Sequence, residues 1–168
     1  MVRYGIRVLG IAAMAAGVAS CMQGGGRQTA AAVPAPTVPN FGLFYMDEGQ
    51  DAKLAYGEPN SDNVGLMFQC AKGSRVIEVT DAPHNSGEPS ITLASSGRSQ
   101  VLKARLESGE GAMLLVATTP YNVAPLSAFR RSGRLEVAQA GARYGVAASA
   151  NERVGVERFF AACEGGKG

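Results

Sequence analysis

The sequence predicts a mainly β domain, an antiparallel β-sandwich or barrel of about eight to nine short strands that ends in one helix. Three observations support this class. Apolar and polar residues alternate with a period of two in several segments after Phe41, turn-forming residues separate those segments, and a helical pattern occurs near the C-terminus. Such alternation is typical of strands with one buried face, and short, evenly spaced strands favour a sandwich or barrel.

The first residues have the pattern of an export signal. Arg3 and Arg7 form a basic start, and residues 8–19 are apolar. About a dozen apolar residues are too few to span a bilayer, which takes about 20, but they suit a signal peptide. We therefore expect residues 1–20 to be removed during export.

The run Val18-Ala19-Ser20-Cys21 resembles the lipobox of bacterial lipoproteins. The resemblance implies a diacylglycerol and usually a further acyl chain, such as palmitate, on Cys21. Two or more chains anchor a protein stably, whereas one chain is marginal. Because Met22 follows the cysteine, where Asp would signal inner-membrane retention, the resemblance implies the outer membrane, facing the periplasm. The alternatives are an ordinary secretory signal with an incidental cysteine and a short anchor that is never cut.

Residues 21–40 are expected to be the lipidated cysteine and a disordered tether. A Gly triplet, an Ala run and three prolines leave this stretch without a periodic apolar face. As a flexible chain it would reach roughly 25 Å. The remaining residues, 41–168, are expected to form a single domain.

Strands within this domain can be placed by their patterns. Alternation predicts half-buried strands around residues 64–70, 77–80, 102–106, 135–137 and 144–148. The continuous apolar run from Met113 to Ala117 predicts a strand covered on both faces. Clusters of Gly, Ser, Asn and Asp between these segments predict turns.

A helix is predicted over about residues 150–164. Ser149 and Glu152 match a capping box at its start, and Gly165 is expected to end it. Apolar residues at i, i+3, i+4 and i+7 should pack on the sheet; they are Val156, Phe159, Phe160 and Cys163.

Two cysteines remain after Cys21, and both fall on predicted inward faces. Exported domains meet an oxidising compartment, where buried thiols tend to pair. We therefore predict a disulfide between Cys70 and Cys163 that clips the last helix to a strand. The alternative is two buried free thiols.

The charge pattern does not suggest a nucleic-acid partner. Without Arg3 and Arg7, 14 of the 16 basic residues remain against 14 acidic ones, whereas nucleic-acid binders carry a concentrated basic face. Trp is absent and aromatic residues are 7% of the chain, which argues against stacking platforms. The notable basic patch is Arg130, Arg131 and Arg134. It is either a contact for anionic lipid or an acidic partner or a solvated loop between strands.

Few residues suggest catalysis, and we expect no metal and no cofactor. His84 is the single histidine; a triad would need a Ser and an acid around it, and no Gly-x-Ser-x-Gly elbow occurs. A lone His near Asp81 is also a poor zinc site. Asp47 and Glu48 with Asp51 could form a glycosidase-like carboxylate pair, but their place in a turn favours solvated charges.

The predicted function is a non-catalytic binding or structural module, held on the envelope through lipid on Cys21 and contacting a protein, lipid or glycan there. The first alternative is a hydrolase inhibitor. Residues 140–144, Ala-Gly-Ala-Arg-Tyr, look like the Ser-Gly-x-x-Tyr segment of the C-type lysozyme inhibitors, although the leading Ser is Ala and that family's Trp is missing. A strand-end glycine and a core tyrosine explain the same residues. The second alternative is a small hydrolytic enzyme that uses His84.

A weaker resemblance covers parts of the domain. The stretch from Leu54 to Cys70 and the segment Phe159–Cys163 are similar to small exported proteins of proteobacteria. That resemblance implies export but no particular activity, so no site residues follow from it.

Overall fold

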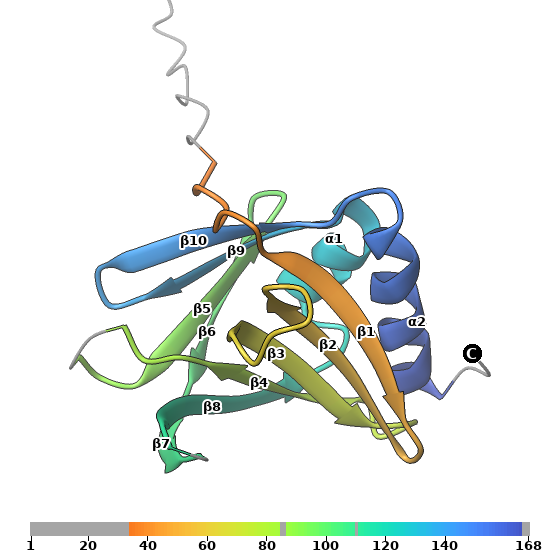
Figure 1. The fold of residues 1–168 in the computed structure, drawn as a ribbon, viewed down its shortest axis with the longest axis horizontal. Coiled ribbons are helices and arrows are strands. Elements are labelled where there is room, and N and C mark those ends of the chain that lie inside the picture. The colour runs from red at the N-terminus through yellow and green to blue at the C-terminus, as the bar shows by residue number, and fades with distance from the viewer. Residues whose placement is uncertain (1–33, 85–86, 110, 166–168) are drawn as a thin grey trace, which may run out of the picture. The chain divides into compact units, whose positions relative to one another are not determined.

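The computed structural model of the protein describes residues 34–84, 87–109 and 111–165 (Figure 1). Their strands form two antiparallel sheets, one of six strands and one of four. This confirms the predicted mainly β fold and gives it the sandwich form. The predicted signal peptide, residues 1–20, and the predicted lipid site, Cys21, lie outside the described residues.

The six-stranded sheet has the order β1-β2-β3-β4-β8-β7. Its strands are β1 (Gly42–Glu48), β2 (Asp51–Gly57), β3 (Val64–Ala71), β4 (Val76–Asp81), β8 (Met113–Pro120) and β7 (Arg105–Ser108). The four-stranded sheet has the order β10-β9-β5-β6. Its strands are β10 (Ala142–Ala147), β9 (Arg134–Gln139), β5 (Ser90–Ser95) and β6 (Arg98–Lys103).

Alternation along each strand decides which side chains enter the core. In β3, Leu66, Phe68 and Cys70 are buried, as predicted, while the residues between them are half-buried. The apolar run in β8 is covered on both faces at Leu115, Val116 and Ala117, which also agrees with the prediction. The core therefore lies between the inner faces of the two sheets.

The segment predicted as one strand at 102–106 is two strands. The chain leaves the four-stranded sheet after β6 and enters the six-stranded sheet as β7, with Ala104 at the corner. The Ala104 amide donates to the Pro89 carbonyl at 3.0 Å rather than to β8. The alternation of apolar and polar residues continues through this corner, because it indicates which face of a sheet a side chain lies on and not which sheet the strand belongs to. The sequence pattern therefore could not separate β6 from β7.

The predicted C-terminal helix is α2 (Glu152–Glu164), and its four predicted core residues are all buried. The capping box is present: the Ser149 amide donates to Glu152 at 2.6 Å, and the Glu152 amide donates to the Ser149 hydroxyl at 3.4 Å. Glu152 Oε1 also accepts the Leu43 amide at 2.9 Å. The start of α2 is thereby fixed to the edge strand β1.

A second helix, α1 (Ala124–Ser132), was not predicted from the sequence. Pro125 lies in its first turn, where a missing amide costs nothing, and Gly133 ends it with a φ of 69°. Its buried residues include Leu126 and Phe129, which enter the core. Neither helix in the described ranges is long and apolar enough to span a membrane.

The folded domain begins before Phe41, the residue at which the sequence placed its start. The Gly145 amide in β10 donates to the Pro36 carbonyl at 2.8 Å, and Thr37 forms a parallel bridge with Gly145. A Cβ at position 145 would lie 2.5 Å from the Ala35 carbonyl oxygen, so this approach requires glycine. Residues 35–38 therefore belong to the sandwich and cover the outer edge of β10.

Cys70 in β3 and Cys163 in α2 are placed as a disulfide, with Cα atoms 5.7 Å apart. Both residues are buried, at 3% and 0% exposure. The bond joins the helix to the centre of the six-stranded sheet, as predicted.

Replacing both cysteines by Ala should lower the free energy of unfolding by about 4 kcal/mol, because the bond closes a loop spanning 93 residues in the unfolded chain. Urea unfolding of the full chain measures this loss. Met67→Leu, on the outer face of the same strand, is the control and should have little effect. A double variant as stable as the wild type would contradict the bond.

Candidate functional site

A group of polar side chains lies between the sheets where the end of β4 meets the β9–β10 hairpin. Asp81 is 1% exposed. Its Oδ2 accepts a hydrogen bond from Gln139 Nε2 at 2.5 Å, and its Oδ1 accepts one from the Tyr144 hydroxyl at 2.9 Å. We call Asp81, Gln139, Tyr144 and the adjoining His84 the Asp81 cluster.

Strand alternation forces these polar groups inward. Asp81 continues the buried face of Ile77 and Val79 in β4, and Gln139 continues that of Leu135 and Val137 in β9. A buried carboxylate is costly unless donors satisfy it. Here the six-stranded sheet supplies the acceptor and the four-stranded sheet supplies both donors, so the bonds tie the two sheets together.

Gln139 also orders the chain that follows β4. Its Nε2 donates to the Ala82 carbonyl at 2.8 Å, and its Oε1 accepts the His84 amide at 3.1 Å. Both amide hydrogens of Gln139 are therefore used, which fixes the orientation of the side chain.

Two stacked tyrosines connect the cluster to the N-terminal segment. The rings of Tyr144 and Tyr56 lie 6.3 Å apart and nearly parallel. The Tyr56 hydroxyl accepts the Val38 amide and donates to the Gly145 carbonyl, each at 3.2 Å. A continuous series of contacts thus runs from residue 38 to Asp81.

Burial dominates the electrostatics of the cluster. Burial raises the pKa of Asp81, while hydrogen bonds from Gln139 and Tyr144 act in the opposite direction. Burial and the neighbouring Asp81 raise the pKa of Tyr144, which keeps its proton and remains a donor. Buried groups with displaced pKa values are candidates for functional sites, although structural networks produce such displacements as well.

A small cavity adjoins the cluster. It has a volume of about 200 Å³ and is lined by Gly87, Glu88, Pro89, Ser90, Leu106, Leu115, Gln139 and Ala140. Gln139 belongs to both the cavity wall and the cluster, so the Asp81 cluster fixes one polar wall of the cavity. Two leucines supply apolar walls, a combination suited to a single apolar side chain or a similar small group.

His84 lies at the surface of the cluster. Its side chain is exposed, and its ring meets the edge of Tyr144 with centroids 5.9 Å apart. Both carboxylate oxygens of Asp81 already accept bonds from other donors. The structure therefore brings His84 near Asp81, but the hydrogen bonds to the Asp81 carboxylate come from Gln139 and Tyr144.

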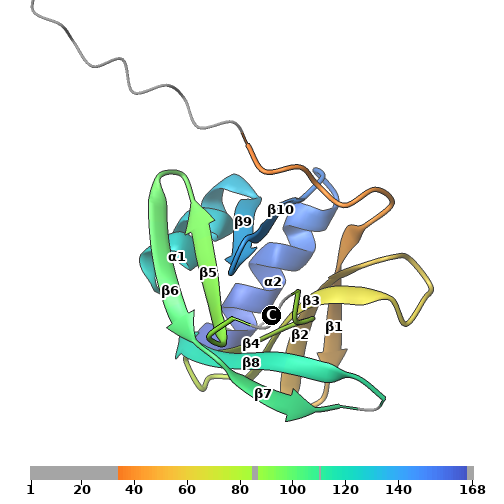
Figure 2. The same ribbon diagram turned by 90° about the vertical axis from the view of Figure 1, so that its left-hand side faces the viewer.

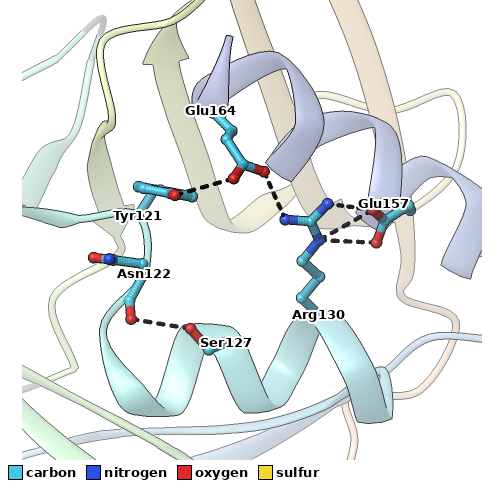
Figure 3. A network of polar contacts seen from close by, with 6 residues as sticks. All are labelled: Tyr121, Asn122, Ser127, Arg130, Glu157 and Glu164. Carbon is cyan, nitrogen blue, oxygen red and sulfur yellow. Dashed lines mark hydrogen bonds and ion pairs between the residues drawn. The ribbon is translucent and has the colours of Figure 1, made fainter. Parts of the chain in front are cut away.

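The structure divides the predicted basic patch, and Figure 3 shows one of its members, Arg130, with its partners. Arg130 lies in α1, not in a loop between strands, and its guanidinium pairs with Glu157 and Glu164 of α2. These two carboxylates raise the pKa of Arg130 and balance its charge. Arg130 thus joins the two helices.

Arg131 and Arg134 are both exposed, on either side of the α1 terminus. Arg153 donates from α2 to the carbonyls of Arg131 and Ser132, which satisfies acceptors at the end of α1. Contact with an anionic partner remains a prediction for Arg131 and Arg134 and is weakened for Arg130.

Two of the carboxylates considered as a glycosidase-like pair form ion pairs with lysines. Asp47 pairs with Lys72 at 2.5 Å and Glu48 with Lys53 at 2.7 Å. Across the described ranges, no three His, Cys, Asp or Glu side chains gather as a metal site.

The segment that looks like a lysozyme-inhibitor motif, residues 140–144, forms the β9–β10 turn and the start of β10. Gly141 lies in that turn with a φ of 90°, and the Tyr144 hydroxyl donates to Asp81.

Replacing Asp81 by Asn tests the buried charge. Because the folded-state pKa of Asp81 is raised, its contribution to stability is complete below pH 3.8 and is lost as the pH rises through the folded pKa. The wild type should therefore lose stability relative to Asp81→Asn as the pH rises from about 3.8, as measured by urea unfolding at a series of pH values.

Asp47→Asn provides a control of opposite sign. Lys72 lowers the pKa of Asp47, so that carboxylate should contribute stability above pH 3.8 and lose it as the pH falls. If the wild type instead gained stability relative to Asp81→Asn as the pH rose, as expected for Asp47, the account of a desolvated Asp81 would be wrong.

Comparison of the chain with protein-family models, with curated proteins and with solved structures found no match. The function of the domain must therefore be inferred from its own residues and their geometry.

Proposed function

We propose that this protein is a lipid-anchored envelope lipoprotein that acts as a non-catalytic binding module in the periplasm, with the outer membrane as its destination. The address rests on the resemblance of residues 18–21 to a lipobox. The observation that carries the proposal is the buried pair Cys70 and Cys163, placed at disulfide distance. Lasting disulfides belong to exported proteins, and this pair is independent of the lipobox.

Binding is favoured over catalysis because the polar groups of the Asp81 cluster form hydrogen bonds with one another. Asp81 accepts from two donors, and Gln139 uses both of its amide hydrogens. A general base must lie within hydrogen-bond reach of its substrate, whereas Asp81 is 1% exposed. The cluster instead resembles a rigid support for the cavity beside it, and we place partner contact at that cavity.

The lipid anchor is tested with Cys21→Ser in the full chain. Cells fed a labelled fatty acid should label the wild type and not the variant, and the variant should leave the membrane fraction. Gln23→Ser is the matched control, since it introduces a serine two residues further on but keeps the lipid site. A wild-type chain that stays unlabelled and keeps its first 20 residues would overturn the proposed address.

The binding role is tested by crosslinking in cells followed by co-purification. Ala140→Trp would fill the mouth of the cavity and should reduce recovery of a crosslinked partner at least severalfold. Ala147→Trp is the control, because residue 147 is exposed on β10 at the other end of the same hairpin. Equal recovery from both variants would remove the cavity from the proposal.

A further inference from the structure

Strand β7 forms an open edge of the six-stranded sheet. It pairs with β8 on one side, and no other strand of the described residues pairs with its second side. Figure 2 shows β7 at the border of the sheet, with its free side turned away from the domain. All four residues of β7 are exposed.

The backbone of Leu106 points to this free side. The Gly109 amide donates to the Ala112 carbonyl at 2.8 Å, which makes positions 109 and 112 a hydrogen-bonded pair. Backbone groups in an antiparallel ladder alternate sides, so Arg105 and Glu107 bond to β8 while Leu106 and Ser108 face outward. The Ala104 amide follows the same alternation, because it bonds to Pro89 and not to β8.

The side chains of β7 also alternate. Leu106 lies opposite Leu115 on the inner face and is 53% exposed, beside the cavity that both leucines line. Arg105 and Glu107 lie on the outer face and form an ion pair with each other. Arg105 also lies 3.6 Å from Glu78 of β4.

We infer that β7 is a self-association edge, at which a second copy of this chain adds its own β7 in antiparallel orientation about a two-fold axis at Leu106. This register places Leu106 opposite Leu106 of the second copy as a hydrogen-bonded pair. Arg105 then lies opposite Glu107 of the second copy, and Glu107 opposite its Arg105. The inner row Leu115–Leu106 continues into the same row of the second copy.

Charge complementarity makes a second copy the occupant. Opposite charges on facing residues of an antiparallel pair are favourable, and facing non-hydrogen-bonded residues bring their side chains closest. Arg105 and Glu107 occupy those positions twice in the two-fold register. The four charges alternate in sign within and between the strands, so no like charges face each other.

The contact would also cover apolar surface that the monomer exposes. Leu106 would pack against Leu106 of the second copy at the mouth of the cavity, where the single chain leaves it half open to water. Four-residue strands form a small interface, so the association should be weak and depend on concentration. It requires neither the lipid nor the proposed binding partner.

Charge reversal tests the register. Glu107→Arg and Arg105→Glu each place like charges opposite one another at two positions of the dimer, and each should weaken association about tenfold. The double variant R105E/E107R restores both facing pairs and should return association to near the wild-type value. Dissociation constants are measured on the full chain in detergent by sedimentation equilibrium, at equal micelle concentration throughout.

All four proteins keep the same N-terminus, so shared micelles affect them equally. Thermal unfolding of each variant verifies folding, which exposed β7 positions should not disturb. Leu106→Glu should abolish association. A wild type that stays monomeric at every concentration, or a double variant as weak as the single ones, would overturn the inference, and neither result would bear on lipidation of Cys21.

Discussion

The burial of one carboxylate between two sheets organises this end of the domain. Asp81 belongs to one sheet and its two donors to the other, so the buried carboxylate keeps its hydrogen bonds only while the two sheets stay together. Removing one of these partners by substitution would leave the others buried and unsatisfied, which costs more than the bond itself contributes. Further contacts extend from this group, through Gln139 to the Ala82 carbonyl and through the stacked Tyr144 and Tyr56 to the Val38 amide.

The opposite end of the sandwich is held by apolar and covalent contacts. Phe68, Phe129, Phe159 and Phe160 form a chain of ring contacts between β3 and the two helices. The disulfide and the Arg130 ion pairs add fixed links at the same end. The apolar, disulfide-linked end of the sandwich thus contrasts with the polar end, which holds the Asp81 cluster and the cavity.

The sequence predicts what depends on local pattern and misses what depends on distant pairing. The helix that carries Phe159 and Phe160 and the faces of β3 and β8 follow from periodicity, and the disulfide follows from inward parity. Helix α1 was not predicted, although Leu126 and Phe129 have the i, i+3 spacing of one helix face, because its nine residues are fewer than the window of about 11–18 in which such a period is normally recognised. The Asp81 cluster joins positions 58 and 63 residues apart, and the available signal was weak: a polar residue at an inward position at the end of each strand.

Exposed strand edges constrain every open sandwich, since unpaired backbone groups invite association. Residues 35–38 cover β10, and α2 lies against β1, where Gly155 allows a close approach to Tyr45. The edge strand β6 has Arg98 and Lys103 at its ends, so full antiparallel overlap of two β6 strands would bring like charges face to face. Strand β7 has opposite charges at positions that face each other in a two-fold pair. The charges on β6 therefore disfavour pairing with a second copy of that strand, whereas the charges on β7 favour it.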